Sequence, residues 1–379
     1  MLEHIYIDNV RSFSNFEMTF GHLNLLLGPN GAGKSNLFEV VRSVRSLIGG
    51  DADVRSVFGP ETITRWDTRG DQKVEFLFDV AATKYRYLLE IEHDPSRSKR
   101  RIKHEALGVF DSRQTWRPLY EAHKDKAQLY RDDGSEGPEV IADWYRSGLS
   151  IIQPRGDNKL LTRFKEAIYQ IWVASPVPSK MAASSKSEVE VPDYEFSDFS
   201  SWYRCMSGER QGDVFELTET LREGVLENFD SFRLARVSDE EKRLQVLFRL
   251  GVAGTSEPPP VEYSFEELSD GQKILIALYA MHQFALRSGS TFCLDQPENH
   301  LAIPEIQPWL SKVCDAADEG RCQVILITHH PELINLLASD SGYWFDRDES
   351  GPTRVSRVAA RGTAGLPVSE LIARGWLHA

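Results

Sequence analysis

The sequence of 379 residues predicts an α/β protein, in which strands and helices alternate at both ends of the chain and antiparallel strands lie between them. Near the N-terminus, the short apolar run 23–27 leads through a glycine-rich turn into a helical pattern over 34–47. Near the C-terminus, helices and buried strands alternate at 271–286, 291–294, 305–317 and 324–327. From 73 to about 131 the apolar residues recur with a period of two, which is typical of antiparallel strands.

The remaining elements follow from the same patterns. The alternation of 4–10 predicts a first strand, and polar turns separate four antiparallel strands at 74–80, 84–91, 102–110 and 119–129. In the middle of the chain we expect an apolar strand at 148–152, helices at 164–174 and 213–229, and a strand at 244–250. Small, acidic and proline residues over 176–201 predict a mobile linker, and 254–260 is a cluster of structure-breaking residues.

These elements suggest three consecutive domains. The first, 1–152, holds the glycine-rich turn and an antiparallel β subdomain; the second, 153–260, is a helical lobe that contains the linker; the third, 261–379, holds the last helices and strands. The sequence has no internal repeat and no sustained heptads, so we expect no long coiled-coil arm.

Composition excludes several classes of protein. Lys and Arg number 44 against 57 Asp and Glu, which gives a net charge of −13 and argues against a surface coated with positive charge for nucleic acid. The four cysteines form no C-x-x-C pair, so we expect reduced thiols and no metal site built from them. The sequence has no apolar run of membrane-spanning length and no signal peptide, so we expect a soluble, cytoplasmic protein without a membrane partner.

The strongest motif is Gly28-Pro-Asn-Gly-Ala-Gly-Lys-Ser35, which fits the phosphate-loop pattern between a buried strand and a helix. Glycines allow backbone N–H groups to curl around phosphates, and the helix N-terminus adds partial positive charge. Lys34 would reach the β- and γ-phosphates and Ser35 would ligate Mg²⁺. The predicted ligands are therefore ATP and Mg²⁺, and the predicted nucleotide-binding residues are Asn30, Gly31, Ala32, Gly33, Lys34, Ser35 and Asn36.

Two further motifs complete a nucleotide site. The apolar run 291–294 delivers Asp295 at its C-terminal end, where the carboxylate would hold Mg²⁺ opposite Ser35; a structural Asp is the alternative. Leu268-Ser-Asp-Gly-Gln272 opens a helix. Ser269 is a natural N-cap there, and the same exposed helix end could instead bind the γ-phosphate of a nucleotide held by another subunit.

The order of these motifs resembles the ATP-binding-cassette (ABC) ATPases. The details resemble the RecF/SMC/OLD branch, and in particular stand-alone AAA-family ATPases of bacterial anti-phage defence and toxin–antitoxin-like operons. The segments that carry this resemblance are Ile7-Asp-Asn-Val-Arg-Ser-Phe13, Asp295-Gln-Pro-Glu-Asn299 and Thr328-His-His-Pro-Glu-Leu333.

The resemblance implies an ABC-ATPase head that dimerises around two ATP molecules, with Ser269, Gly271 and Gln272 of one subunit facing the phosphate loop of the other. It implies that His329 is a switch histidine near the γ-phosphate, although a polar loop residue is the alternative. Gln153 is the candidate for a glutamine that links Mg²⁺ to the helical lobe, or an ordinary loop residue. Arg11 either contacts nucleotide or stabilises the first strand.

One position departs from the family pattern. The residue after Asp295 is usually a Glu that polarises the attacking water, and here it is Gln296. A neutral amide orients water but accepts no proton, and a positioned general base contributes about 10²–10⁴ in rate. Three interpretations stay open: an engineered Glu→Gln variant that traps ATP, a natural slow hydrolase, or a catalytic carboxylate supplied by Glu298.

The sequence shows no second catalytic constellation, so we expect the output to lie in a partner effector, a nuclease or a toxin. The alternatives are an ATP-gated scaffold that hardly turns over and a RecF-like DNA-repair ATPase that acts on DNA ends. The basic cluster 97–103 is either a contact for a nucleic-acid backbone or a solvated turn. The acidic, aromatic stretch 188–199 is either a docking strip or part of the linker.

Overall fold

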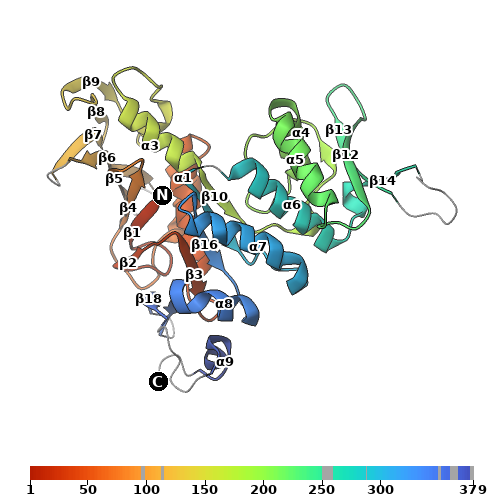
Figure 1. Cartoon of the computed structure of the whole chain (residues 1–379). Coiled ribbons are helices and arrows are strands. Elements are labelled where there is room, and N and C mark those ends of the chain that lie inside the picture. The colour runs from red at the N-terminus through yellow and green to blue at the C-terminus, as the bar shows by residue number, and fades with distance from the viewer. Residues whose placement is uncertain are drawn as a thin grey trace. The chain divides into compact units, whose positions relative to one another are not determined.

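The computed structural model describes residues 1–94, 99–111, 115–249, 259–286, 288–348, 351–358 and 366–375. The chain forms two compact units (Figure 1). Unit 1 comprises Met1–Val173, Ser288–Cys293 and Gly320–Ala379, and unit 2 comprises Ala174–Arg287 and Leu294–Glu319. The sequence predicts three consecutive domains instead; the units are interleaved because segments from both ends of the chain build one sheet.

An antiparallel sheet of eight strands forms the larger part of unit 1, in the order β2-β1-β4-β5-β6-β7-β8-β9. The strands are β1 (Leu2–Asp8), β2 (Phe16–Thr19), β4 (Asp71–Val80), β5 (Thr83–Asp94), β6 (Lys99–Phe110), β7 (Trp116–His123), β8 (Lys126–Tyr130) and β9 (Glu136–Ile141). The expected single strand 119–129 is wrong: a turn that contains Lys124, at φ 58°, divides it into β7 and β8.

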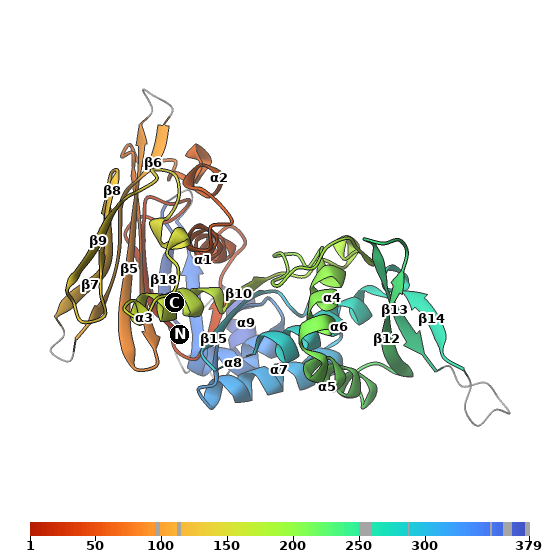
Figure 2. The ribbon, with the colours of Figure 1, turned by 90° about the horizontal axis from the view of Figure 1, so that it is seen from above.

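Helices cover one face of this sheet in Figure 2. They are α1 (Lys34–Gly49) and α3 (Lys159–Tyr169), and the ring of Phe164 contacts the rings of Phe78, Tyr85 and Tyr87. Short helices α2 (Val54–Val57) and η1 (Pro60–Thr62) follow α1. Two expectations fail here: 148–152 is mostly the 3₁₀ helix η2 (Gly148–Ile151), and the predicted helix 164–174 ends at Tyr169, before strand β10 (Ile171–Ala174).

A second sheet has the order β10-β15-β16-β3-β17-β18. Its strands include β3 (Leu23–Leu27), β15 (Ser290–Asp295), β16 (Cys322–Ile327), β17 (Gly342–Asp346) and β18 (Arg354–Arg357). Strand β3 pairs in parallel with β16 and with β17, so the loops after β3 and β16 leave the same edge. Helix α8 (Pro331–Ser341) packs on β3 and β17, and α9 (Val368–Ala373) packs on α8. This sheet confirms the expected mainly parallel core.

Unit 2 consists of helices and a small antiparallel sheet. Its elements are η3 (Pro178–Lys180), β11 (Ser184–Ser185), α4 (Phe199–Glu209), α5 (Gln211–Arg222), β12 (Phe229–Arg236), β13 (Lys242–Phe248), β14 (Val261–Ser264), η4 (Phe265–Glu267), α6 (Asp270–Ala285) and α7 (Ile303–Asp318). The strand expected at 244–250 is β13. The helix expected at 213–229 ends at Arg222, since Gly224, at φ 153°, does not continue a helix, and Phe229 begins β12. Residues 250–258, which hold most of the predicted breaker cluster, lie outside the described part.

The segment 176–201 is not the mobile linker that its composition predicts. Met181, Ala183 and Phe196 are buried in unit 2, and β11 pairs with β13. The ring of Phe199, at the start of α4, stacks on Phe265 with centroids 5.1 Å apart. Large apolar residues spaced among small and acidic ones therefore anchor this segment, although the average composition is that of a loop.

Among the described residues, the longest helices have 16 residues, so this part of the chain holds no long coiled-coil arm. Within the same residues, no helix is both long and apolar enough to cross a bilayer.

Candidate nucleotide-binding site

The phosphate loop that follows β3 has a backbone that only glycine accommodates at two positions. Gly28 and Gly33 have φ of 137° and 107°, in the left-handed region. A Cβ on Gly33 would lie 2.5 Å from Thr353 Oγ1 and 2.8 Å from Ser12 Oγ, and one on Gly28 would lie 2.1 Å from the carbonyl oxygen of Phe345. Gly28 and Gly33 are therefore required both by conformation and by close packing.

Helix α1 begins at the end of this loop with the features of an anion site. Its N-cap, Gly33, provides no side-chain cap, and the first turn contains no acidic residue. The buried Lys34 donates from Nζ to the carbonyl oxygens of Gly28, at 2.6 Å, and Pro29, at 3.0 Å. The ammonium group thus lies inside the curve of the loop, where a phosphate would meet both it and the helix N-terminus.

Two residues that sequence reasoning missed hold the loop in place. Thr353 Oγ1 is buried and lies 2.8 Å from both the Ala32 carbonyl oxygen and Ser12 Oγ. Ser12 Oγ in turn accepts a hydrogen bond of 3.0 Å from Asn36 Nδ2. Ser12 belongs to the motif 7–13, so the sequence offered a signal for it. Thr353 is 321 residues from Ala32 in the chain, and no local pattern marks it.

A cavity of about 220 Å³ lies beside the loop within unit 1. Its lining residues are Arg11, Ser12, Asn36, Glu61, Ile63, Arg65, Trp66 and Arg347. The indole of Trp66 is 40% exposed, and the guanidinium of Arg347 lies 5.1 Å from its centroid. Arg11 Nη2 is 2.6 Å from Glu39 Oε2 on α1. Arg11 therefore ties the loop after β1 to α1 and also lines the cavity, which leaves both sequence interpretations open.

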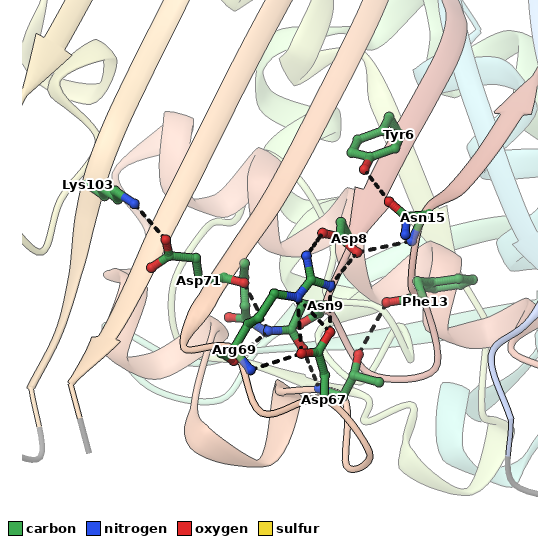
Figure 3. A network of polar contacts seen from close by, with 11 residues as sticks. Tyr6, Asp8, Asn9, Phe13, Asn15, Asp67, Arg69, Asp71 and Lys103 are labelled. Atoms are coloured by element: carbon green, nitrogen blue, oxygen red, sulfur yellow. Dashed lines mark hydrogen bonds and ion pairs between the residues drawn. The ribbon is translucent and has the colours of Figure 1, made fainter. Parts of the chain in front are cut away.

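A polar network holds the segment before β4, which contributes Trp66, against the end of β1 (Figure 3). The guanidinium of Arg69 bonds both carboxylate oxygens of Asp8, at 2.8 and 3.1 Å, and also bonds Asp67. The hydrogen bond from Arg69 lowers the pKa of Asp67. Asn9 Nδ2 donates to the carbonyl oxygens of Arg69 and Asp71, at 2.8 and 2.9 Å. These contacts fix the backbone that positions one wall of the cavity.

Asp295 is the last residue of the fully buried strand β15, as its motif predicts, and lies in unit 2. Tyr194 donates from its hydroxyl to Asp295 Oδ2 at 3.2 Å. Gln296 has φ of 51°, and its Oε1 accepts a hydrogen bond of 3.0 Å from Asn299. A non-glycine residue in the left-handed region is strained, and such strain is concentrated at functional sites. Glu298 is buried.

His329 is exposed in unit 1, two residues after the end of β16. Since β16 and β3 are parallel neighbours, His329 and the phosphate loop follow strands that end at the same edge of the sheet. His330 is the N-cap of α8, and its Nδ1 accepts from the Glu332 amide at 3.2 Å. His330 therefore fills the capping role for which a Ser, Thr, Asp or Asn is commonly used.

The helix α6 starts with the cap expected for Ser269. Its Oγ accepts from the amide of Gln272 at 3.3 Å, and the Gln272 side chain accepts from the amide of Ser269 at 3.0 Å. This reciprocal pair is a capping box. A Cβ on Gly271 would lie 3.1 Å from the carbonyl oxygen of His300, so the loop after β15 lies against this helix start in unit 2. The capping interpretation is confirmed, and the contact with a second subunit stays a prediction.

Two weaker expectations have mixed outcomes. Gln153 is exposed and follows a 3₁₀ helix rather than the expected strand, and its carbonyl oxygen accepts a hydrogen bond from Asn158. Its role toward Mg²⁺ stays a prediction.

In the basic cluster 97–103, residues 97–98 lie outside the described part. Arg101 pairs with Glu92 at 2.8 Å and Lys103 with Asp71 at 2.6 Å, which favours a charge-balanced strand over an open basic patch.

The predicted residues thus fall into two sets, one in each unit. Unit 1 holds the phosphate loop, Gln153 and His329, and unit 2 holds Asp295, Gln296 and the start of α6. The hydroxyl of Ser35 and the carboxylate of Asp295 are hard oxygen donors of the kind that Mg²⁺ prefers, and the uncapped N-terminus of α1 suits phosphate. The donor chemistry present therefore fits Mg·ATP.

Comparisons with known proteins agree with this chemistry. Residues 4–144 match the family described as "AAA domain", and residues 213–335 match "AAA domain, putative AbiEii toxin, Type IV TA system". The structure is similar to the Smc head domain with an extended coiled coil bound to the C-terminal domain of ScpA from Pyrococcus furiosus, with a TM-score of 0.52, 13% identity, and 98% of each chain covered. It also matches the SMC head domain from Thermotoga maritima, with a TM-score of 0.46, 12% identity, and 94% and 98% of the two chains covered. A comparison with curated proteins finds no match.

The fold is therefore that of an SMC-type head, and it confirms the expected head architecture. Together with the two AAA-domain matches and the phosphate loop, it supports an ATPase of the AAA/SMC-like type.

Proposed function

We propose that this chain binds and hydrolyses Mg·ATP, dimerises while ATP is bound, and thereby regulates a partner effector in bacterial anti-phage defence. The observation that carries the nucleotide part is the phosphate loop. Ser12 and Thr353 pack against Gly33 and hold the loop in place, and the loop ends at a helix N-terminus that no side chain caps. The defence role is supported more distantly, by the toxin–antitoxin description of the family that matches 213–335.

In this mechanism the residues act mainly by positioning charge. The N–H groups of the loop and Lys34 meet the phosphates, and Ser35 and Asp295 supply oxygen ligands for the ion. Bound Mg²⁺ would neutralise part of the negative charge that develops on the phosphates. The start of α6, with Ser269 and Gly271, closes the site from the partner subunit. His329 contacts the γ-phosphate, since it follows a strand that ends at the same edge of the sheet as the strand before the phosphate loop.

We assign the base and ribose to the cavity of about 220 Å³ beside the loop. Trp66, which is 40% exposed, lines this cavity with Arg347 over its ring, and Arg11 and Arg347 supply positive charge. Stacking on an indole does not distinguish one base from another, so we expect this cavity to bind a nucleotide without a strong preference for adenine over guanine.

Gln296 makes this chain a slow enzyme in the proposal. Its amide accepts a hydrogen bond from Asn299 and orients water without accepting a proton. A slow hydrolase keeps ATP bound for longer and so keeps the dimer closed. The same observation favours the second candidate function, an ATP-gated scaffold that holds its partner and scarcely turns over.

The test is steady-state ATP hydrolysis by the parent chain and by the Gln296→Glu variant, at equal concentration with Mg²⁺. We expect the variant to be faster by about 10² or more, because a carboxylate can take the proton of the attacking water. Lys34→Ala is expected to abolish nucleotide binding, while Lys126→Ala, on the surface of β8, serves as the matched lysine control.

Equal rates for parent and Gln296→Glu would show that position 296 does not activate the attacking water. The hydrolysis rate of Glu298→Gln would then show whether Glu298 supplies the catalytic carboxylate. Nucleotide binding that survives in Lys34→Ala would contradict the proposed site itself. Turnover that rises with DNA and falls steeply with salt would favour the RecF-like alternative over a protein effector.

A further inference from the structure

Three side chains outside the nucleotide site converge on the face of the antiparallel sheet that lies opposite buried Glu105. His104 on β6 and His123 on β7 are direct cross-strand partners. Glu121 lies two residues before His123 and so faces the same side of the sheet. One ligand atom from each of the three lies within 4.8 Å of the other two. Strand register alone brings these residues together, since nothing in their local sequence resembles a metal motif.

The distances among these atoms suit a bound metal ion as well as hydrogen bonds. Glu121 Oε1 lies 3.3 Å from His123 Nε2 and 3.5 Å from His104 Nε2. Around a tetrahedral zinc ion with bonds near 2.1 Å, two ligand atoms are about 3.4 Å apart. His104 Nε2 is buried and has no hydrogen-bond partner, so it needs a proton acceptor, a water or a metal on that side.

The second nitrogen of His104 faces a carboxylate, at a distance longer than a hydrogen bond. Its Nδ1 lies 4.0 Å from Glu90 Oε2, and Glu90 is the direct partner of His104 on β5. A carboxylate on the far nitrogen fixes the ring of a ligating histidine and increases its basicity. The sheet therefore supplies two imidazoles, one direct carboxylate and one supporting carboxylate.

The charge balance also favours a cation. The rings of His104 and His123 are stacked, with centroids 3.9 Å apart and planes at 12°, so the in-plane lone pairs of their Nε2 atoms do not converge in this arrangement. The largely exposed ring of His123 must therefore turn for both nitrogens to bind one ion. The nearby Lys126 is paired with Glu139 at 3.1 Å and Lys103 with Asp71 at 2.6 Å, which leaves Glu90 and Glu121 to attract a cation.

We propose that His104, His123 and Glu121 form a binding site for a divalent transition-metal ion of the zinc class, with Glu90 as the supporting carboxylate. Two histidines and a carboxylate leave at least one coordination position for water. Because its ligands come from both β6 and β7, a bound ion stabilises the β subdomain of unit 1.

The probe is Zn²⁺ added as its chloride to the full chain without a histidine tag, in competition with a chromophoric chelator. We expect one ion per chain, with affinity about 10-fold or more weaker in His104→Gln and in His123→Gln. Co²⁺ substitution should give the visible absorption of a tetrahedral or five-coordinate site in the parent only. His123 is largely exposed, so its variant is expected to fold, and thermal unfolding of the metal-free proteins checks this.

The matched control is His4→Gln. His4 pairs with Glu17 at 3.8 Å across two strands of the same sheet, but it has no second histidine opposite, since its strand partner is Thr19. It should bind zinc like the parent. Failure of the parent to take up zinc, or equal uptake by both cluster variants, would show that the three residues form only a hydrogen-bonded surface patch.

Discussion

Glu105 is fully buried within the β subdomain, on the opposite face of β6 from His104. Its carboxylate accepts hydrogen bonds from the Tyr87 hydroxyl at 2.9 Å, the Ser147 hydroxyl at 2.5 Å and the Gly148 amide at 3.0 Å. Burial nevertheless raises the pKa of Glu105 above its ordinary value of 4.5. Burial also raises the pKa of Tyr87 well above its usual range. One carboxyl group thus joins β5, β6 and the segment before η2.

We predict that Glu105 makes the stability of the chain depend on pH. Because the pKa is raised on folding, the folded state binds more protons than the unfolded state above pH 4.5. The stabilising contribution is therefore complete below pH 4.5 and is lost as the pH rises through the raised pKa. Each tenfold difference in proton affinity between the folded and unfolded states contributes ~1.4 kcal/mol. Glu105→Gln should flatten this slope, since the hydroxyls of Tyr87 and Ser147 can rotate to accept from its amide.

Urea unfolding of the parent and of Glu105→Gln at several pH values measures the two slopes. Glu136→Gln, an exposed position on β9 of the same sheet, controls for the loss of one negative charge. If the slopes of the parent and of Glu105→Gln coincide, Glu105 does not couple protonation to folding.

At the scale of elements, the phosphate loop shows how conformation and packing combine. Gly31 and Gly33 both have positive φ, at 80° and 107°. A Cβ on Gly31 would meet nothing within 4 Å, whereas one on Gly33 would overlap with Thr353 and Ser12. A substitution at Gly31 therefore introduces backbone strain alone, whereas the same substitution at Gly33 introduces both strain and steric overlap.

We expect Gly31→Ala to lower the free energy of unfolding by about 1–2 kcal/mol, the cost of an alanine in the left-handed region. Gly33→Ala should cost more than Gly31→Ala, because the added methyl must also displace the hydroxyls that hold the loop. Gly33→Ala should also weaken nucleotide binding more strongly than Gly31→Ala does. Urea unfolding and binding of a fluorescent ATP analogue give both comparisons, and equal losses in the two variants would contradict the packing argument.

Elements with a long, regular pattern were predicted well, and the failures have physical causes. The apolar run 23–27 is β3, and the helix expected at 34–47 is α1 with one more half-turn. The predicted strand 119–129 was wrong because the two-residue turn is Lys124-Asp125, in which Lys124 takes a positive φ without glycine, and the single Asp125 is a weak signal. The segment 176–201 was misjudged because its few large side chains pack into unit 2 despite their polar surroundings.

At the scale of the whole molecule, the proposed cycle predicts an oligomeric state that depends on nucleotide. With Mg·ATP, the parent chain should double its mass in light scattering, because slow hydrolysis at Gln296 keeps the closed form. Ser269→Arg should remain monomeric, since it places a bulky, charged side chain at the exposed start of α6 that is proposed to face the partner's ATP.

The variant also loses an N-cap, which costs about 1 kcal/mol, so thermal unfolding must show that it is folded. Ser135→Arg, in the exposed turn between β8 and β9, should dimerise like the parent. A dimer that forms without nucleotide, or that forms equally in Ser269→Arg, would contradict the closure of the site by a second subunit.

The sequence alone determined the α/β class, the phosphate loop with Lys34 and Ser35, the cap at Ser269 and the strand that ends at Asp295. These features depend on residues close together in the chain, where periodicity and glycine spacing report directly on backbone conformation. Only the tertiary structure decided that the chain forms two interleaved units, that Thr353 and Ser12 support the loop, that Trp66 lines a cavity, and that His104 meets His123. Those contacts join residues that are distant in sequence, and strand register and sheet order, which bring them together, leave no local signal.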